Sequence, residues 1–275
     1  MDRTPPSDVE INLEWDDFVW KDPEGGLVYL HGVLPTVVYP NSLRPRIKWS
    51  GLGLMVSEEE IELWEHEEEL EKKSPGINFT GAISQGGDFS RLLGGLSLLE
   101  NIQTCKFPDP EPRRLQKYAV RGEKQVFFIE PPLSDDDWSN WLELHAYELT
   151  RPLKLLSNIW SGRKFKKNLS LMMKKAQVKS GESSEFAVAS GISAAWWIGI
   201  ENAISIELKE KRDTRYASRI RGALAEMRKL GITEPSLLLV TPLAQRVSLF
   251  NALENMPPVE MPLCTETVSE LNEEE

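Results

Sequence analysis

Residues 236–241 read SLLLVT, an unbroken apolar run between two segments with helical periodicity. Such a run is typical of a strand that is buried on both faces, because a strand with one solvated face alternates apolar and polar residues. The segments on either side, 216–230 and 243–253, both place apolar residues at helical spacing. The sequence therefore predicts a central strand between two helices, which is the core of an α/β sheet.

Two more apolar runs come before this unit. Residues 194–200 read AAWWIGI, residues 203–209 read AISIELK, and a two-residue break separates them. Short apolar runs with such a break are typical of a β-hairpin. Residues 259–264 are expected to add a last strand at a sheet edge, because Pro262 cannot donate to a ladder. The expected order is β-β-α-β-α-β, a mixed sheet flanked by helices.

The first half of the chain is expected to be an α+β region. Strands are predicted within 27–39, where a second strand is expected after Pro35, and at 125–129. Helices are predicted to begin at Ser57 and Ser134, where a serine is followed by acids that favour a helix start. Residues 81–95 are glycine-rich and are expected to form a flexible loop before a short helix capped by Asp88, since they lack the Lys-Ser/Thr of a phosphate-binding loop. The predicted organisation is a disordered start at 1–10, an N-terminal α+β region at 11–132, a C-terminal α/β domain at 133–265 and an acidic tail at 266–275.

Composition limits the class of protein. The chain has 275 residues and a formal net charge of −11, and a negative balance argues against a general nucleic-acid coat protein. No apolar run approaches the ~20 residues that span a bilayer, so no membrane insertion is expected. The only cysteines are Cys105 and Cys264. They exclude a disulfide framework and favour a reducing, cytoplasmic location.

One stretch reverses the acidic balance. Residues 163–179 contain seven basic residues and no acid, with apolar residues between them. This pattern is typical of an amphipathic helix with a basic side. Two interpretations of the basic side are open, a solvated helix face and a phosphate-binding patch. The second rests on the rule that clustered Lys and Arg supply the sequence-independent part of nucleic-acid binding. The candidate contacts to DNA or RNA are Arg163, Lys164, Lys166, Lys167, Lys174 and Lys175.

Glu207 and Lys209 stand two residues apart at the end of the second predicted hairpin strand. Alternation along a strand would place both side chains on one face. A carboxylate is a good ligand for Mg²⁺, and a lysine can stabilise charge that develops on a phosphate. The pair is therefore a candidate catalytic site, although Glu-x-Lys is also common on exposed strand edges.

The hairpin, its Glu-x-Lys end, the long helix, the buried strand and the next helix resemble the restriction-endonuclease-like, or PD-(D/E)XK, superfamily over about residues 185–264. The resemblance implies Mg²⁺-dependent cleavage of phosphodiesters, with Glu207 holding the metal and Lys209 contacting the phosphate. The family places a first acid near the start of the hairpin, where residues 193–198 read SAAWWI and contain none. Glu185, just before the hairpin, is the candidate second catalytic acid and metal ligand.

Two functions are expected from these features. The first is a nuclease-like protein that binds nucleic acid and either cleaves it with Mg²⁺ or is a catalytically degenerate relative. The second is a non-enzymatic protein-interaction or assembly protein, which the nine tryptophans and the missing acid favour. His31 is expected to be structural, because no catalytic partner stands near it in the sequence.

Overall fold

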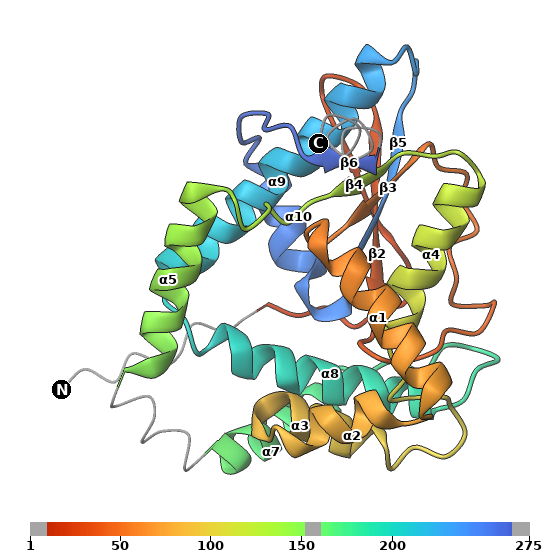
Figure 1. Cartoon of the computed structure of the whole chain (residues 1–275), viewed down its shortest axis with the longest axis vertical. Coiled ribbons are helices and arrows are strands. Elements are labelled where there is room, and N and C mark those ends of the chain that lie inside the picture. Colours follow the sequence, from red (N-terminus) through yellow and green to blue (C-terminus); the bar gives the residue numbers. More distant parts are fainter. Residues whose placement is uncertain (1–9, 152–160, 266–275) are drawn as a thin grey trace.

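The computed structural model describes residues 10–151 and 161–265. The predicted acidic tail, and all but the last residue of the predicted disordered start, lie outside the described residues. Within them, one mixed sheet of six strands has the order β1-β2-β5-β3-β4-β6 (Figure 1). β2, β5, β3 and β4 are parallel, and both edge strands are antiparallel to their neighbours. The strands are β1 Phe18–Lys21, β2 Leu27–Val33, β3 Gly51–Leu54, β4 Val126–Phe128, β5 Ser236–Pro242 and β6 Leu263–Cys264.

The predicted central strand is confirmed. β5 pairs with β2 on one side and with β3 on the other. Leu237 and Leu239 belong to one apolar core, whereas Leu238 and Val240 belong to a second core on the opposite face. All four side chains are buried. Because both faces of β5 are covered, each position can be apolar, which explains the unbroken run in the sequence.

Helices cover both faces of the sheet. One core includes side chains of α5 Asp136–Thr150, α9 Ile206–Lys229 and α10 Arg246–Glu254. The second core includes side chains of α1, α3, α4, α7 and α8. Figure 1 shows α2, α3, α7 and α8 together below the sheet, and α8 contacts the short helix η1 that follows β5. The bounds are α1 Glu59–Lys73, α2 Ile77–Ser84, α3 Gly87–Leu96, α4 Pro110–Arg121, α7 Ser161–Met172, α8 Glu185–Glu201 and η1 Leu243–Gln245.

The predicted hairpin at 194–209 is wrong, because both of its runs are helical. The first run belongs to α8, and the second contains the start of α9, whose N-cap Ser205 accepts a hydrogen bond from the backbone of Leu208 at 3.4 Å. α8 is buried around most of its circumference, so it has no polar stripe to reveal a helical period. A short apolar run without that period cannot be told from a strand by its sequence alone.

In the first half, the helices expected after Ser57 and Ser134 are confirmed as α1 and α5, although neither serine is the N-cap residue. The short helix expected in the glycine-rich segment 81–95 is confirmed as α3, although its N-cap is Gly86 and not Asp88. The loop expected before it is short, because α2 extends to Ser84. Gly95 has a packing reason to lack a side chain, since an added Cβ would lie 3.1 Å from Ile192 of α8. No second strand follows β2 after Pro35 among the described residues.

The α/β class and the mixed sheet with flanking helices are confirmed. The strands of this one sheet come from both sides of the predicted boundary at residue 132, with β1 to β4 before it and β5 and β6 after it. The expected edge strand is also confirmed, but as the two residues of β6. None of the helices in residues 10–151 and 161–265 is long and apolar enough to cross a membrane.

Candidate functional site

The Glu-x-Lys pair does not form the predicted strand site. Glu207 lies in the first turn of α9, its side chain is 75% exposed, and its carboxylate pairs with Lys211 at 2.9 Å. Lys209 lines a pocket of about 320 Å³ between α9 and α10, beside Glu201 and Asp213. On a helix, residues two apart point in different directions. The structure therefore does not present Glu207 and Lys209 on one face.

Glu185 and Glu207 are also far from each other. Glu185 is the first residue of α8, where its carboxylate accepts hydrogen bonds from the backbone and side-chain nitrogens of Asn101, both at 2.7 Å. Glu207 lies beyond the other end of α8, and the rise of a helix separates the two ends by about 24 Å. Two carboxylates at that separation cannot share one Mg²⁺, whose ligand distances are about 2.1 Å. Within the described ranges, no group of three or more His, Cys, Asp or Glu side chains could hold a metal ion.

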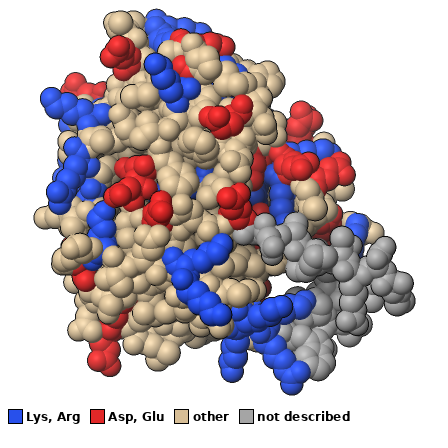
Figure 2. Space-filling model, turned by 180° about the vertical axis from the view of Figure 1, so that it is seen from behind, with Lys and Arg blue, Asp and Glu red and all other residues tan. Residues whose placement is uncertain are grey.

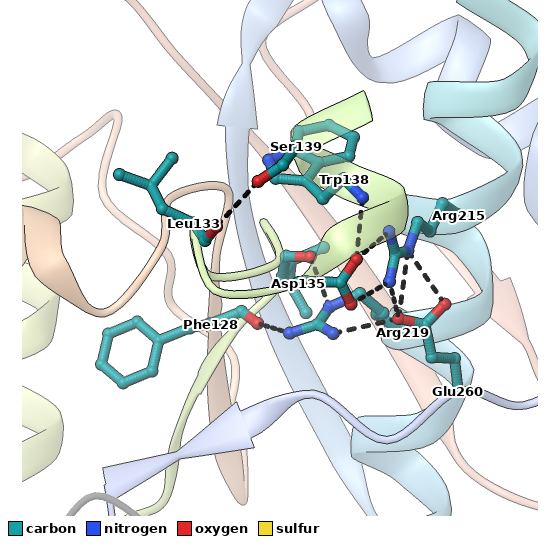
Figure 3. Close-up of polar contacts among 9 residues, drawn as sticks. Phe128, Leu133, Asp135, Trp138, Ser139, Arg215, Arg219 and Glu260 are labelled. Carbon is teal, nitrogen blue, oxygen red and sulfur yellow. Dashed lines mark hydrogen bonds and ion pairs between the residues drawn. The ribbon is translucent and has the colours of Figure 1, made fainter. Parts of the chain in front are cut away.

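The arginines of α9, which would suit a nuclease helix, are engaged inside the protein (Figure 3). Arg215 donates two hydrogen bonds to the carboxylate of Asp135, at 2.9 and 2.6 Å, and also contacts Glu260. Arg219 donates to the backbone carbonyls of Phe128 and Ile129 at the end of β4. Arg212 and Arg221 are likewise buried and paired with acids. These side chains fasten α9 to α5, to β4 and to the segment before β6.

The basic stretch, residues 163–179, behaves as an amphipathic segment. Its first part is α7, which packs Phe165, Leu169 and Met172 against the core that includes α8. Figure 2 shows Lys and Arg gathered over the lower part of the rear face, at the level of α7 in Figure 1. The six predicted phosphate contacts are all exposed: Arg163, Lys164, Lys166, Lys167, Lys174 and Lys175. The helix is confirmed over α7, and residues 173–179 continue it as turns and irregular backbone.

A different group of polar side chains lies at the carboxyl end of the parallel strands. In α/β sheets this edge is where ligands usually bind. His31, the third residue from the end of β2, is 3% exposed, and its Nδ1 lies 2.8 Å from Oδ1 of Asp17. Its Nε2 is buried without a hydrogen-bond partner and lies 4.0 Å from Oε1 of Glu111 in α4. The imidazole therefore stands between two carboxylates.

Arginines hold both ends of this Asp17–His31–Glu111 group in place. Arg246 of α10 is fully buried and donates hydrogen bonds to the backbone carbonyls of Glu14 and Asp16, the latter at 2.7 Å. It thus fixes the chain that carries Asp17. Arg114 pairs with Glu111 through two hydrogen bonds. A histidine whose orientation is set by a carboxylate is an arrangement that recurs in acid–base sites.

Several carboxyl groups near this edge titrate close to neutral pH. Loss of hydration, with the nearby charge of Glu111, raises the pKa of Asp109 to about 7. Burial likewise raises the pKa of Glu130, just after β4, to about 7 and that of Glu67 to about 6. Carboxyl groups shifted in this way gather at functional sites more often than elsewhere. The carboxyl edge is therefore the best candidate for chemistry in this chain.

The sequence missed this site because its members are far apart in the chain. His31 precedes its partner Glu111 by most of the N-terminal region, and Asp17 stands fourteen residues before it. One signal was present, since His31 lies within a predicted strand, and α/β sheets place their ligand-binding residues at the carboxyl ends of strands. The sequence did not show that this strand ends at Val33. The expectation of a purely structural histidine rested on sequence neighbours, which do not report such contacts.

Comparison of the chain with protein-family models, with curated proteins and with solved structures gave no match. The resemblance to the restriction-endonuclease-like superfamily stays a prediction, and the hairpin on which its Glu-x-Lys motif was placed is not formed.

Proposed function

We propose that this chain binds nucleic acid through the basic stretch, which retains the binding half of the nuclease-like expectation. The observation that carries the proposal is the exposure of all six predicted contacts on a segment that packs Phe165, Leu169 and Met172 inward. A helix face that serves only for solvation usually mixes acids with bases, because opposite charges at helical spacing stabilise it. Residues 163–179 contain no acid, although the chain as a whole is acidic. Phosphate groups would relieve the repulsion among these lysines.

The cleavage half of the expectation is not part of this proposal. A magnesium site built from Glu207 and Glu185 would need the two carboxylates to meet, and α8 holds them apart. Binding without that site fits a catalytically degenerate nuclease relative as well as an unrelated nucleic-acid-binding protein. Clustered exposed lysines supply mainly contacts to the phosphate backbone, so the proposal is for binding with little sequence preference.

The test is a titration of labelled single- and double-stranded DNA and RNA at several salt concentrations. Replacing Lys164, Lys166 and Lys167 with Glu should weaken binding to every sequence and reduce the slope of log affinity against log salt by about 2 to 3. A matched control changes three exposed lysines elsewhere, Lys21, Lys72 and Lys106, to Glu. Equal losses in both triple variants, or a wild type that binds none of the probes, would overturn the proposal.

Protein interaction is the second candidate, and exposed apolar side chains at α5 favour it. Leu133, Leu144 and Tyr147 are 63%, 51% and 62% exposed. Grouped apolar side chains on a surface often mark a protein contact. This alternative predicts a concentration-dependent mass in light scattering that Leu144→Glu with Tyr147→Glu abolishes. A wild type that stays monomeric at all concentrations removes self-assembly as the role of this surface.

A further inference from the structure

A polar pocket of about 380 Å³ opens beside Asp17 and His31 at the carboxyl edge of the sheet. Its volume lies within the range of small-molecule sites, which is about 300 to 1,000 Å³. Three basic side chains share the pocket with the Asp17–His31 pair: Arg44, Arg46 and Lys179. The pocket therefore has cations and a hydrogen-bonded carboxylate facing one space.

The basic side chains have capacity for an anion. Nε of Arg44 is buried without a hydrogen-bond partner, while its Nη1 donates to Asn41 at 2.7 Å. Lys179 pairs with Asp16 at 2.8 Å, but the Asp16 side chain is 91% exposed. An ion pair open to water contributes little, so Lys179 can exchange Asp16 for a bound anion at low cost. A phosphate group, with several acceptor oxygens, matches such a set of donors.

On the acidic side of the pocket, the carboxylate of Asp17 can accept a hydrogen bond from a ligand. Oδ1 of Asp17 is held by His31, and the side chain of Asp17 is 19% exposed. Because the ionised carboxylate only accepts hydrogen bonds, its remaining capacity suits a hydroxyl group of a ligand. A second anion placed there would be repelled. His31 acts here as a positioning residue, since it fixes the rotation of the carboxylate.

We propose that this pocket binds a sugar phosphate, with the phosphate at Arg44, Arg46 and Lys179 and a sugar hydroxyl at Asp17. The inference goes beyond nucleic-acid binding by α7, and it assigns a ligand to residues that the basic stretch does not include, apart from Lys179. A ligand with both groups satisfies both sides of the pocket. Inorganic phosphate has no sugar hydroxyl for Asp17 to bind, and a free sugar has no negative charge for the basic side chains to bind.

The sugar phosphate has two possible sources, because the basic stretch ends at the pocket. Lys179 is its last basic residue, and the indole nitrogen of Trp15 donates to the carbonyl of Gln177 at 2.6 Å. Residues 177–179 therefore lie beside the segment that carries Asp17. A free nucleotide or sugar phosphate and the phosphorylated end of a nucleic-acid strand present the same chemistry to these side chains.

The first experiment is a calorimetric titration of the full chain with ribose 5-phosphate, ribose and inorganic phosphate. Ribose 5-phosphate should bind at least about tenfold more tightly than either part. Arg44→Gln and Asp17→Asn should each remove about tenfold, as expected for the loss of a charge-assisted hydrogen bond. Arg121→Gln, which changes an exposed arginine on α4, should have no effect. Arg44 is only partly buried, so its variant tests the site even if Asp17→Asn fails to fold.

Equal affinity for ribose 5-phosphate and inorganic phosphate, or normal affinity in Arg44→Gln, would overturn the proposal. A second arm compares one RNA oligonucleotide, whose terminal sugar keeps a free 2′-hydroxyl, with a 5′-phosphate and with a 5′-hydroxyl. If the strand end is the ligand, the phosphorylated form binds more tightly and Arg44→Gln removes the difference, whereas Asp17→Asn weakens both forms. The triple variant of Lys164, Lys166 and Lys167 should weaken both oligonucleotides but not ribose 5-phosphate. Failure of the α7 proposal and failure of the pocket proposal are therefore distinguishable.

Discussion

Arg215 donates hydrogen bonds to both carboxylate oxygens of Asp135, although the two residues are 80 positions apart in the chain. Asp135 is also the N-cap of α5 and accepts a hydrogen bond from the backbone of Trp138 at 2.8 Å. The ion pair holds the pKa of Asp135 below its usual range. One carboxylate therefore begins a helix and joins it to α9, so its two roles can be separated by substitution.

Asp135→Asn keeps a good helix cap and loses the charge, whereas Asp135→Ala loses both. We expect the alanine variant to unfold more easily than the asparagine variant by about 1 kcal/mol, which is the usual contribution of an N-cap. Urea denaturation of both variants and the wild type measures this difference. Equal stability of the two variants would mean that the cap contributes nothing at this position.

Gly222 of α9 should not tolerate a side chain. A Cβ there would lie 1.9 Å from the backbone oxygen of Glu260, so the segment before β6 would have to move. We expect Gly222→Ala to lower thermal stability strongly, even though alanine is the better helix former. Gly199 of α8 is the matched control, because a Cβ there meets nothing within 4 Å. Gly199→Ala should stabilise by about 0.5 to 1 kcal/mol, and a gain at both positions would contradict the packing of Gly222.

Loss of charge should cost much less stability at Glu207 than at Glu201. Glu207 is exposed and pairs with Lys211, so Glu207→Gln should cost less than about 0.5 kcal/mol and leave nucleic-acid binding unchanged. Glu201 is buried and pairs with Arg212 at 2.8 Å. Glu201→Gln should cost about 3 to 5 kcal/mol, because it leaves a buried guanidinium undercompensated. If the wild type had a Mg²⁺-dependent activity and Glu207→Gln lost it, the predicted nuclease site at Glu207 would be supported.

Asp109 should make the protein less stable as pH rises toward neutrality. Its folded-state pKa of about 7 lies above the usual value of about 3.9. Between these values the folded protein holds a proton that the unfolded chain has released, so stability is present at acid pH and is lost as pH rises to about 7. For one such proton, the free energy of unfolding changes by at most about 1.4 kcal/mol per pH unit. Asp109→Asn should flatten this part of the profile.

Glu68 supplies a control of opposite sign for that experiment. Its hydrogen bonds from Arg113 and Lys117 lower its pKa to about 2, so its contribution is present above its usual pKa and is lost as pH falls toward 2. Glu68→Gln should therefore change the acid limb of the stability profile and leave the range from pH 5 to 7.5 as it was. The measurement is the urea midpoint of each variant across that range. If the midpoint of Asp109→Asn fell with pH as steeply as that of the wild type, Asp109 would not be the source of the pH dependence.

The sequence predicted elements whose cause is local. The predictions of β5 and of the starts of α1 and α5 are correct. Burial on two faces gives consecutive apolar residues, and the charge at a helix start favours consecutive acids, so both patterns can be seen in a short stretch of sequence. α8 was misread because a helix buried on nearly all sides has no amphipathic period. Of the two-residue break before Ala203, Glu201 is the last residue of α8 and Asn202 is its C-cap.

The candidate site could not be predicted in the same way. His31 meets Asp17 and Glu111 only after β2 has paired and α4 has packed against the sheet. The Glu-x-Lys motif failed for the converse reason, since its geometry depended on a strand that tertiary packing replaced with a helix. Contacts between distant residues are set by topology, and a single sequence gives topology only indirectly.

The place of β5 in the sheet has a consequence for how the chain is made. β2 and β3 leave the ribosome early, but the strand that pairs with both of them is residues 236–242. Until that segment emerges, two apolar strands keep unpaired edges, which are hazards for association with other chains. A product that stops short of β5 cannot close its sheet at all. Completion of the sheet is thus tied to the synthesis of residues 236–242, and chains that end before them expose the strand edges that β5 would cover.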